Sequence, residues 1–399
     1  MQRSLIAIIA LIFSISAHAA QQPKEWTLLV YLNGNNNLDS FGAMNINQME
    51  KVGSTDRINI VVQWASIAND KVERLYITKD NDTNTVTSKV IEDMGHVDMG
   101  DYHSVINFVK WGSEHYPAQH YMVDIWDHGS GWHDLLPGEV TKGISWDETT
   151  GNHITTKQFA TALSESSKIL GQKIDIYGSD ACLMAMAELA NEVTDSVKIY
   201  AGSEETEPGA GWPYDTFLTR WNALPAGATG ADVGRVLSEE YAKSYQGGSS
   251  NVTFSAFNLE ALSAMNAAIK TFADTFKKLS AAELTKVKKV ATDSLHFEVG
   301  DYIDFVDFIT HMKSAKISKF GKSTFTDIGT ATKDFIVASN AVGYPAAHGM
   351  SIWIPTDADT YSQYASDYSQ MNFDHETHWG DVAKAIATAA APASQLTQK

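Results

Sequence analysis

The stretches YMVDIWDHGSGW (residues 121–132) and IDIYGSDAC (residues 174–182) share one design. Each begins as an apolar run that is typical of a buried strand and ends in a glycine-bearing loop. The first loop carries His128 and the second carries Cys182. In open α/β sheets, functional sites form just beyond the carboxyl ends of the strands. If the two strands are neighbours, His128 and Cys182 therefore project from the same edge of one sheet.

Further apolar runs alternate with segments of helical periodicity. Strands are predicted at residues 26–32, 58–64, 72–77, 85–91 and 197–201. Helices are predicted at residues 104–111 and after a capping box formed by Thr155 and Gln158. This alternation indicates an α/β/α sandwich with a mostly parallel central sheet.

The chain changes character after residue 258. A second capping box, formed by Ser280 and Glu283, and several helical patterns follow, with one late strand at residues 351–354. We therefore expect an α/β domain over residues 25–258 and a mainly helical C-terminal extension over residues 259–399, with that one strand in it.

The first nineteen residues form a separate unit. Arg3 precedes the apolar run at residues 5–15, and Ala17-His18-Ala19 fits a cleavage site for small residues. This pattern predicts a signal peptide over residues 1–19 and export to a periplasm or out of the cell. The run is too short to span a bilayer, and no later stretch is apolar enough to do so.

The composition indicates a globular protein and disfavours nucleic acid as a partner. The chain has 399 residues, of which 44% are hydrophobic, enough for a large core. Its formal net charge of −18 disfavours nucleic-acid binding, which needs clustered Lys and Arg.

Cys182 is the only cysteine, so no internal disulfide can form. A lone cysteine is often an inert, buried small hydrophobe, but its pairing with His128 in matching loops favours a reactive thiol. A thiol becomes nucleophilic beside an imidazole or at a helix N-terminus, and a helix is expected at about residues 183–193. His128 can protonate a departing amine, and the amides of Gly129 and Cys182 are candidate oxyanion donors.

Five stretches carry a resemblance to a known family. DIWDHGSGW (residues 124–132) resembles the histidine motif of the clostripain family of cysteine peptidases, and DIYGSDACLMAMAELA (residues 175–190) resembles its nucleophile motif. Stretches at residues 26–40, 143–155 and 202–214 agree with the family in the same order. The resemblance implies a caspase-like fold and a cysteine endopeptidase with a Cys182/His128 dyad that has no obligatory third member.

The resemblance also implies a specificity. In this family the acid two residues before the nucleophile, here Asp180, lies in the S1 pocket and selects Arg or Lys at P1. A buried carboxylate suits a guanidinium, although Asp at this position is also typical of a helix cap. The loop that follows, with Ser203, Glu204 and Glu205, is expected to add substrate-binding groups. The expected partner is a peptide or protein with a basic P1 residue.

Two further family properties are implied. Self-cleavage between the two motifs is common, and Lys142 is the candidate site here. Some members use calcium, but no EF-hand loop locates a calcium site in this chain. Asp374, His375, His378 and Asp381 lie close in sequence, yet His-x-x-His is a loose pattern and no metal site is predicted. No other cofactor is expected.

Two alternatives stay open on sequence alone. The fold can serve as a catalytically silent binding or adhesion protein. The chain can also be a legumain-like cysteine hydrolase with a different P1 preference.

Overall fold

The computed structural model describes residues 23–133 and 143–391. Within them, one nine-stranded sheet organises the chain. Its strands, in spatial order, are β12 (Ile336–Val342), β10 (Val252–Asn258), β9 (Val197–Gly202), β8 (Ile174–Asp180), β5 (Ala118–Trp126), β1 (Lys24–Gly34), β2 (Ile58–Ser66), β3 (Lys71–Tyr76) and β4 (Lys89–Gly95). The central strands β9, β8, β5, β1 and β2 are parallel, and the strands at both edges are antiparallel.

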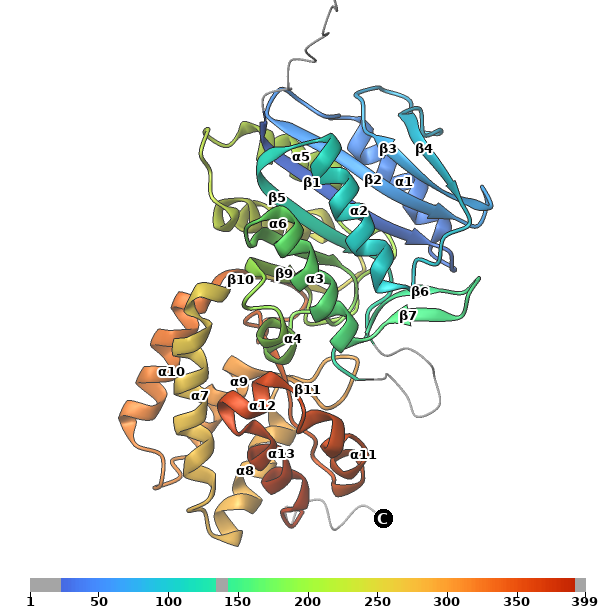
Figure 1. Ribbon diagram of the computed structural model, residues 1–399. Helices are drawn as coiled ribbons and strands as arrows, with labels where there is room; N and C mark the ends of the chain where they lie inside the picture. Colours follow the sequence, from blue (N-terminus) through green and yellow to red (C-terminus); the bar gives the residue numbers. More distant parts are fainter. Residues whose placement is uncertain (1–22, 134–142, 392–399) are drawn as a thin grey trace, which may run out of the picture.

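Helices cover both faces of this sheet, as the α/β/α prediction requires. One face packs against α2 (Tyr102–His115), α3 (Thr156–Leu170) and the short α4 (Ala187–Glu192). The other face packs against α1 (Asp39–Glu50), α5 (Tyr214–Ala223) and α6 (Gly230–Tyr245). In Figure 1, α2 and α3 cross in front of the sheet. The predicted capping box of Thr155 and Gln158 is present at the start of α3.

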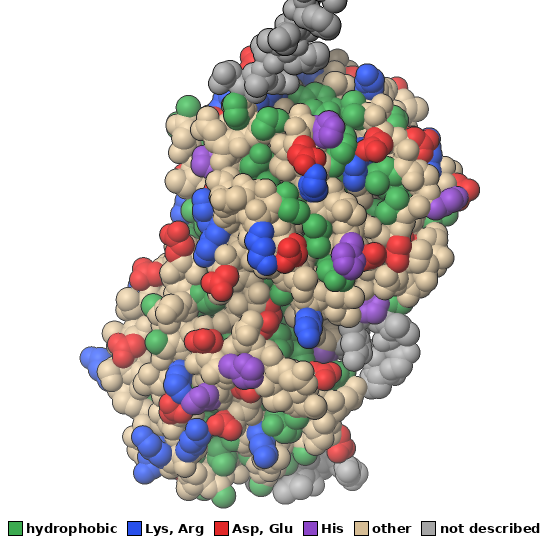
Figure 2. Space-filling model, viewed as in Figure 1, with side chains coloured by type: hydrophobic (Ala, Val, Ile, Leu, Met, Phe, Trp, Pro, Cys, Tyr) green, Lys and Arg blue, Asp and Glu red, His purple; other side chains and the backbone are tan. Residues whose placement is uncertain are grey.

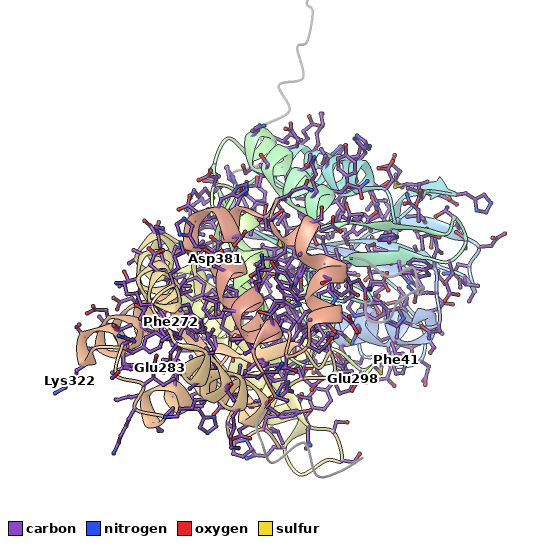
Figure 3. All side chains as sticks on the ribbon, turned by 90° about the horizontal axis from the view of Figure 1, so that it is seen from below. Phe41, Phe272, Glu283, Glu298, Lys322 and Asp381 are labelled. Atoms are coloured by element: carbon purple, nitrogen blue, oxygen red, sulfur yellow. The ribbon has the colours of Figure 1, made fainter. Side chains whose placement is uncertain are left out.

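The residues after 258 form most of the lower part of the molecule in Figure 1. Their elements are η1 (Leu259–Ala261), α7 (Leu262–Phe276), α8 (Ala281–Asp293), β11 (Tyr302–Asp304), α9 (Phe305–Ser314), α10 (Lys322–Phe335), β13 (Ser351–Trp353), α11 (Ala358–Tyr368), α12 (Asn372–Thr377) and α13 (Trp379–Thr388). Figure 3 shows Phe272 of α7 inside this helical part and Lys322 at its edge. The capping box of Ser280 and Glu283 begins α8 as predicted.

The prediction of one late strand was incomplete. The predicted strand is β13, which pairs with β11 in a separate two-stranded sheet. Strand β12 returns to the central sheet and pairs with β10. Its residues are only partly buried, so the sequence lacks the continuous apolar run that marks the central strands.

Two surface observations complete the fold. On the face shown in Figure 2, acidic, basic and histidine side chains are interspersed over both the sheet part and the helical part. None of the described helices combines the length and apolar composition that crossing a bilayer requires.

Candidate active site

The two motif loops leave neighbouring strands at the same edge of the sheet. Strands β5 and β8 run parallel, with Trp126 opposite Asp180 at their carboxyl ends. The next amide, of Asp127, donates a hydrogen bond of 3.2 Å to the carbonyl of Asp180. His128 and Cys182 follow directly, and both line the same two cavities.

Gly129 allows the two loops to touch. A Cβ atom at this position would lie 2.5 Å from the carbonyl oxygen of Cys182, which no real side chain tolerates. Gly129 also pairs with Ile144 of the hairpin β6 (Ile144–Asp147) and β7 (Asn152–Ile154). Among the described residues, neither the Gly129 amide nor the Cys182 amide donates a hydrogen bond to another group. Both amides therefore remain available to a ligand.

The imidazole of His128 is held by a residue that sequence reasoning missed. Its Nε2 lies 2.7 Å from Oδ1 of Asn37, and because this oxygen only accepts, Nε2 carries the proton. Among the described residues, Nδ1 makes no hydrogen bond and keeps its lone pair. Burial lowers the pKa of His128 below its usual range, so the ring is neutral at neutral pH. Asn37 belongs to the polar run Asn33–Asn37 at the end of β1, the strand beside β5, and nothing in the local pattern separates it from the other asparagines of that run.

The helix predicted at about residues 183–193 is present only as α4 (Ala187–Glu192), so its predicted start was wrong and the thiol of Cys182 does not lie at a helix N-terminus. Leu183 has a left-handed φ of 64°, and α4 begins only at Ala187. The intervening segment is extended: the amide of Ala185 donates to the Ser203 carbonyl, and its carbonyl accepts from Ser351. The donor to Sγ is instead the amide of Glu207, at 3.2 Å. Burial raises the pKa of Cys182 to about 11, so the resting sulfur is a thiol.

Asp180 lines the smaller cavity. It ends β8, and no helix follows directly, so the helix-cap interpretation is wrong. Its Oδ2 accepts hydrogen bonds from the Trp212 amide at 3.1 Å and the Tyr214 hydroxyl at 2.9 Å. Burial raises the pKa of Asp180 to about 7. Gly211, with φ 58°, lies over the carboxylate where a side chain would collide with it.

The loop after β9 contributes different residues from those expected. Ser203 Oγ lies 3.0 Å from Thr253 Oγ1. Glu204 accepts from the Gly349 amide at 3.0 Å, and Glu205 from the Tyr344 hydroxyl at 2.9 Å. None of Ser203, Glu204 and Glu205 lines either cavity.

The acid that does line the smaller cavity is Glu207. The residue is half-buried, but its two carboxylate oxygens are buried. Burial together with the neighbouring Asp180 carboxylate raises the pKa of Glu207 well above the usual range. Of the three glutamates in this loop, Glu207 therefore lines the pocket that also holds Asp180, whereas Glu204 and Glu205, which the sequence suggested, do not. The sequence could not show which of these four neighbouring polar residues faces the cavity, because their directions depend on partners at least 25 residues away.

The two cavities share only His128 and Cys182. The smaller one, of 140 Å³, is lined by Leu38, Asp180, Glu207 and the segment that ends at Gly211. The larger one, of 330 Å³, is lined by Gly129, Ser130, Ile144, Trp146, His153 and Leu183, among others. The sulfur and the imidazole therefore stand at the junction of an acidic pocket and a mainly apolar one.

Residues of the C-terminal part make hydrogen bonds to the loop after β5 and to the loop after β9, and they line neither cavity. The Tyr302 hydroxyl donates to the Ser130 carbonyl at 2.9 Å and accepts from the His133 amide at 3.1 Å. The Glu298 amide donates to the Glu205 carboxylate at 3.2 Å. Figure 3 shows Glu298 on the same side of the molecule as Phe41 of α1.

Some predicted features lie elsewhere. Lys142 and the signal peptide fall outside the described residues. His378, from the cluster considered for a metal, lies 2.8 Å from the Lys270 amino group, a cation that disfavours a metal there. Within residues 23–133 and 143–391, no three His, Cys, Asp or Glu side chains are grouped closely enough to hold a metal ion.

Comparison with known proteins agrees with this geometry. The model of the clostripain family matches residues 30–386, which is most of the chain. The chain belongs to the clostripain family. It is a cysteine endopeptidase, and peptides or proteins are its substrates.

Individual clostripain-family proteins share low sequence identity with this chain, but the matches cover most of its length. Clostripain from Hathewaya histolytica is 23% identical over an alignment of 423 residues, covering 88% of this chain and 78% of that protein. A secreted C11 cysteine protease from Bacteroides thetaiotaomicron, solved with an irreversible peptide inhibitor, superposes with a TM-score of 0.69 at 20% identity. That match covers 89% of this chain and 99% of the other. An inactive zymogen C11 protease from Parabacteroides distasonis gives 0.68 at 18% identity, covering 89% and 98%. These structures confirm the predicted caspase-like fold.

Proposed function

We propose that this chain is an exported endopeptidase that cleaves after Arg or Lys, with Cys182 as nucleophile and His128 as general acid and base. One observation carries the proposal. The only residues that line both pockets are His128 and Cys182, and the smaller pocket is also lined by Asp180 and Glu207, whose carboxyl groups are buried.

The chemistry starts from two neutral groups. As Sγ of Cys182 bonds to the scissile carbonyl carbon, the thiol proton passes to Nδ1 of His128, which Asn37 leaves unprotonated. The carbonyl oxygen takes the negative charge, and the amides of Gly129 and Cys182 are suited to stabilise it. The carbon–nitrogen bond then breaks, the imidazolium gives its proton to the departing amine, and a thioester remains.

Water completes the cycle. His128 takes a proton from water as its oxygen attacks the thioester carbon. The carbon–sulfur bond breaks, the sulfur recovers the proton, and the carboxylic acid product leaves. Asn37 is a positioning residue in both halves, because it fixes which ring nitrogen carries the resting proton.

The acidic pocket supports the choice of a basic P1 side chain. The carboxyl groups of Asp180 and Glu207 are buried near Cys182, and their pKa values are raised. Ionisation of either group is therefore unfavourable unless a cation lies beside it. An Arg or Lys side chain supplies that cation and favours ionised Asp180. A neutral P1 side chain leaves the acids without a counter-charge and binds more weakly.

A fluorogenic peptide panel varied only at P1 tests the proposal. We expect cleavage after Arg and Lys, and none of comparable rate after Gln, Asn or Asp. A preference for Asn would favour the legumain-like alternative. An Arg-terminated thiol-reactive peptide that fails to label Cys182 in folded protein, together with no cleavage, would favour a silent binding protein.

Export and self-cleavage are further parts of the proposal. The signal-peptide pattern supports a mature protein that begins at residue 20 or 21, which N-terminal sequencing of the exported protein checks. Cleavage after Lys142 should produce two fragments in the wild type and none in the Cys182→Ala or Lys142→Ala variants. Intact wild-type protein with full activity would contradict self-cleavage without touching the peptidase assignment.

A further inference from the structure

Apart from His128, Gly129 and Cys182, the residues that line the larger cavity have no role in the chemistry described above. This cavity meets the acidic pocket only at His128 and Cys182, so a peptide with its scissile bond over the sulfur reaches both. In an extended peptide, successive side chains point in opposite directions. A P1 side chain in the acidic pocket therefore directs the side chains of its two neighbours, P2 and P1′, away from that pocket.

The walls of the larger cavity favour P1′ over P2. They are built on the His128 loop and on the β6 hairpin that pairs with it, through hydrogen bonds from Ser145 to the His128 carbonyl and from Ser130 to the Gly143 carbonyl. The imidazole must reach the departing nitrogen, and that nitrogen is the backbone atom of the P1′ residue. The P1′ side chain begins one bond further on, on the same side of the site.

Trp146 is turned into the cavity by a local irregularity. Strand β6 changes register between Ile144 and Asp147, and Ser145 has a φ of 62°. A bulge of this kind redirects a side chain, and a positive φ in a non-glycine residue persists only when its surroundings impose it.

Hydrogen bonds and a ring contact fix the irregular segment, residues 144–147. Ser145 Oγ donates to the Met99 carbonyl at 2.8 Å. The Trp146 carbonyl accepts from Asn36 at 2.9 Å. The indole stacks on His153 with ring centroids 5.4 Å apart. The aromatic wall is therefore fixed on two sides before any ligand arrives.

The chemistry of the cavity selects an apolar ligand. Ile144, Trp146 and Leu183 form its apolar walls, and its volume of 330 Å³ is more than twice the 140 Å³ of the acidic pocket. We propose that this cavity is the S1′ subsite and takes a large apolar or aromatic side chain. The inference rests on the proposed cleavage after Arg or Lys. It adds a preference for the residue that follows the scissile bond, P1′.

Internally quenched peptides with Arg at P1 test the subsite directly. P1′ is varied among Gly, Ala, Leu, Phe and Asp, and P2 is varied in a parallel series. We expect kcat/KM for Phe or Leu at P1′ to exceed that for Gly by about 10-fold or more. Trp146→Ala should reduce this ratio to about 3 or less, while Trp146→Phe should keep part of it.

The ratio compares two substrates of one enzyme, so a partly folded preparation does not distort it. Ile169→Ala is the matched control, because it truncates an apolar side chain that is 38% exposed on α3, outside both cavities. It should keep the wild-type ratio. A flat P1′ series in the wild type, an unchanged ratio in Trp146→Ala, or an apolar preference at P2 that Trp146→Ala removes would each overturn the assignment. Failure to cleave any peptide in the panel would instead overturn the proposed function.

Acyl transfer provides a second, independent readout. The thioester formed from an Arg ester is captured by an added amino-acid amide, whose nitrogen attacks the thioester carbon as sulfur leaves. Phenylalanine amide should compete with water better than glycine amide in the wild type, and this advantage should shrink in Trp146→Ala. Equal capture of the two amides by the wild type would contradict an apolar S1′ subsite.

Discussion

The groups that line the site come from the sheet part, whereas the C-terminal part supplies hydrogen bonds that hold them. Asn37, His128, Cys182 and Glu207 follow the ends of β1, β5, β8 and β9. Tyr302 and Tyr344 lie outside both cavities, yet each contacts a loop that carries one of these groups. This difference predicts two classes of variant. Loss of a group proposed to react should abolish the chemistry, whereas loss of a support should only impair the geometry of the site.

Removing the sulfur should have the largest effect. Cys182→Ala is expected to reduce kcat/KM on an Arg fluorogenic peptide by at least about 10⁴-fold, because nothing else in the site can form the thioester. Steady-state kinetics give the loss, and thermal unfolding shows whether the fold survives. Activity within tenfold of wild type would contradict the assignment of Cys182.

Removing the carboxylate of Asp180 from the acidic pocket should have the second-largest effect on activity. Asp180→Asn keeps the shape of the side chain but leaves a basic P1 group without its partner. We expect kcat/KM for Arg substrates to fall by about 100-fold or more and the preference for Arg over Gln to shrink. Glu205→Gln is the matched control, because Glu205 lies outside the pocket, and it should keep the wild-type preference.

The same carboxyl makes the activity depend on pH. Its pKa is raised to about 7, so kcat/KM for Arg substrates should rise with pH through this range, and less steeply in Asp180→Asn. Stability should show the opposite trend. The raised pKa stabilises the protonated native form, fully below the unfolded-state pKa of about 4, and this contribution is lost as pH rises through 7. Unfolding temperatures measured from pH 5 to 8 that fall no faster in the wild type than in Asp180→Asn would contradict this account.

Loss of the support under the histidine loop should have an intermediate effect. Tyr302→Phe leaves the Ser130 carbonyl and the His133 amide without the hydroxyl, at a cost of about 1–3 kcal/mol of unfolding free energy. We expect kcat to fall by about 10-fold with KM little changed, because a displaced imidazole impairs proton transfer more than binding. Thermal unfolding and the separate kinetic constants check both parts. A fall in stability with unchanged kcat would make Tyr302 purely structural.

The sequence was most informative where one physical pattern decides the structure. Apolar runs followed by glycine loops placed His128 and Cys182 at adjacent strand ends, since parallel strands share an edge. The two capping boxes could also be predicted, because each joins residues only three positions apart. Asp180 was suggested by the family resemblance alone, since its partners Trp212 and Tyr214 lie more than 30 residues away.

The sequence was least informative where a distant partner decides the structure. Leu183 leaves the helical region because residues 183–186 pair with Ser203, Glu205 and Ser351. Glu205 turns away from the cavities because the Glu298 amide and the Tyr344 hydroxyl bind it. Such choices depend on contacts between residues 18 to more than 160 positions apart, which local patterns do not encode.

Loss of the support under the Glu205 loop should be milder than loss of Tyr302. Tyr344 is only half-buried, and water can replace its hydroxyl at the Glu205 carboxylate. Tyr344→Phe should cost about 0.5 kcal/mol and raise KM for Arg substrates about two- to threefold. An effect as large as that of Tyr302→Phe would mean that the two supports are equivalent.

Removal of divalent cations by chelation should have the smallest effect on activity and stability. It tests whether the hydrogen bonds from the C-terminal part are sufficient to hold the loops of the site. The loops around His128 and Cys182 are tied by hydrogen bonds to Tyr302, Glu298 and Tyr344, all from the C-terminal part. If these contacts are the supports, EDTA should change neither kcat/KM on an Arg peptide nor the unfolding temperature. Added Ca²⁺ should likewise leave both unchanged. A loss of activity in EDTA that Ca²⁺ restores would show that a bound cation shares the task of holding the loops. The C-terminal part would then be one of two supports, and the effect of Tyr302→Phe should grow when the cation is removed.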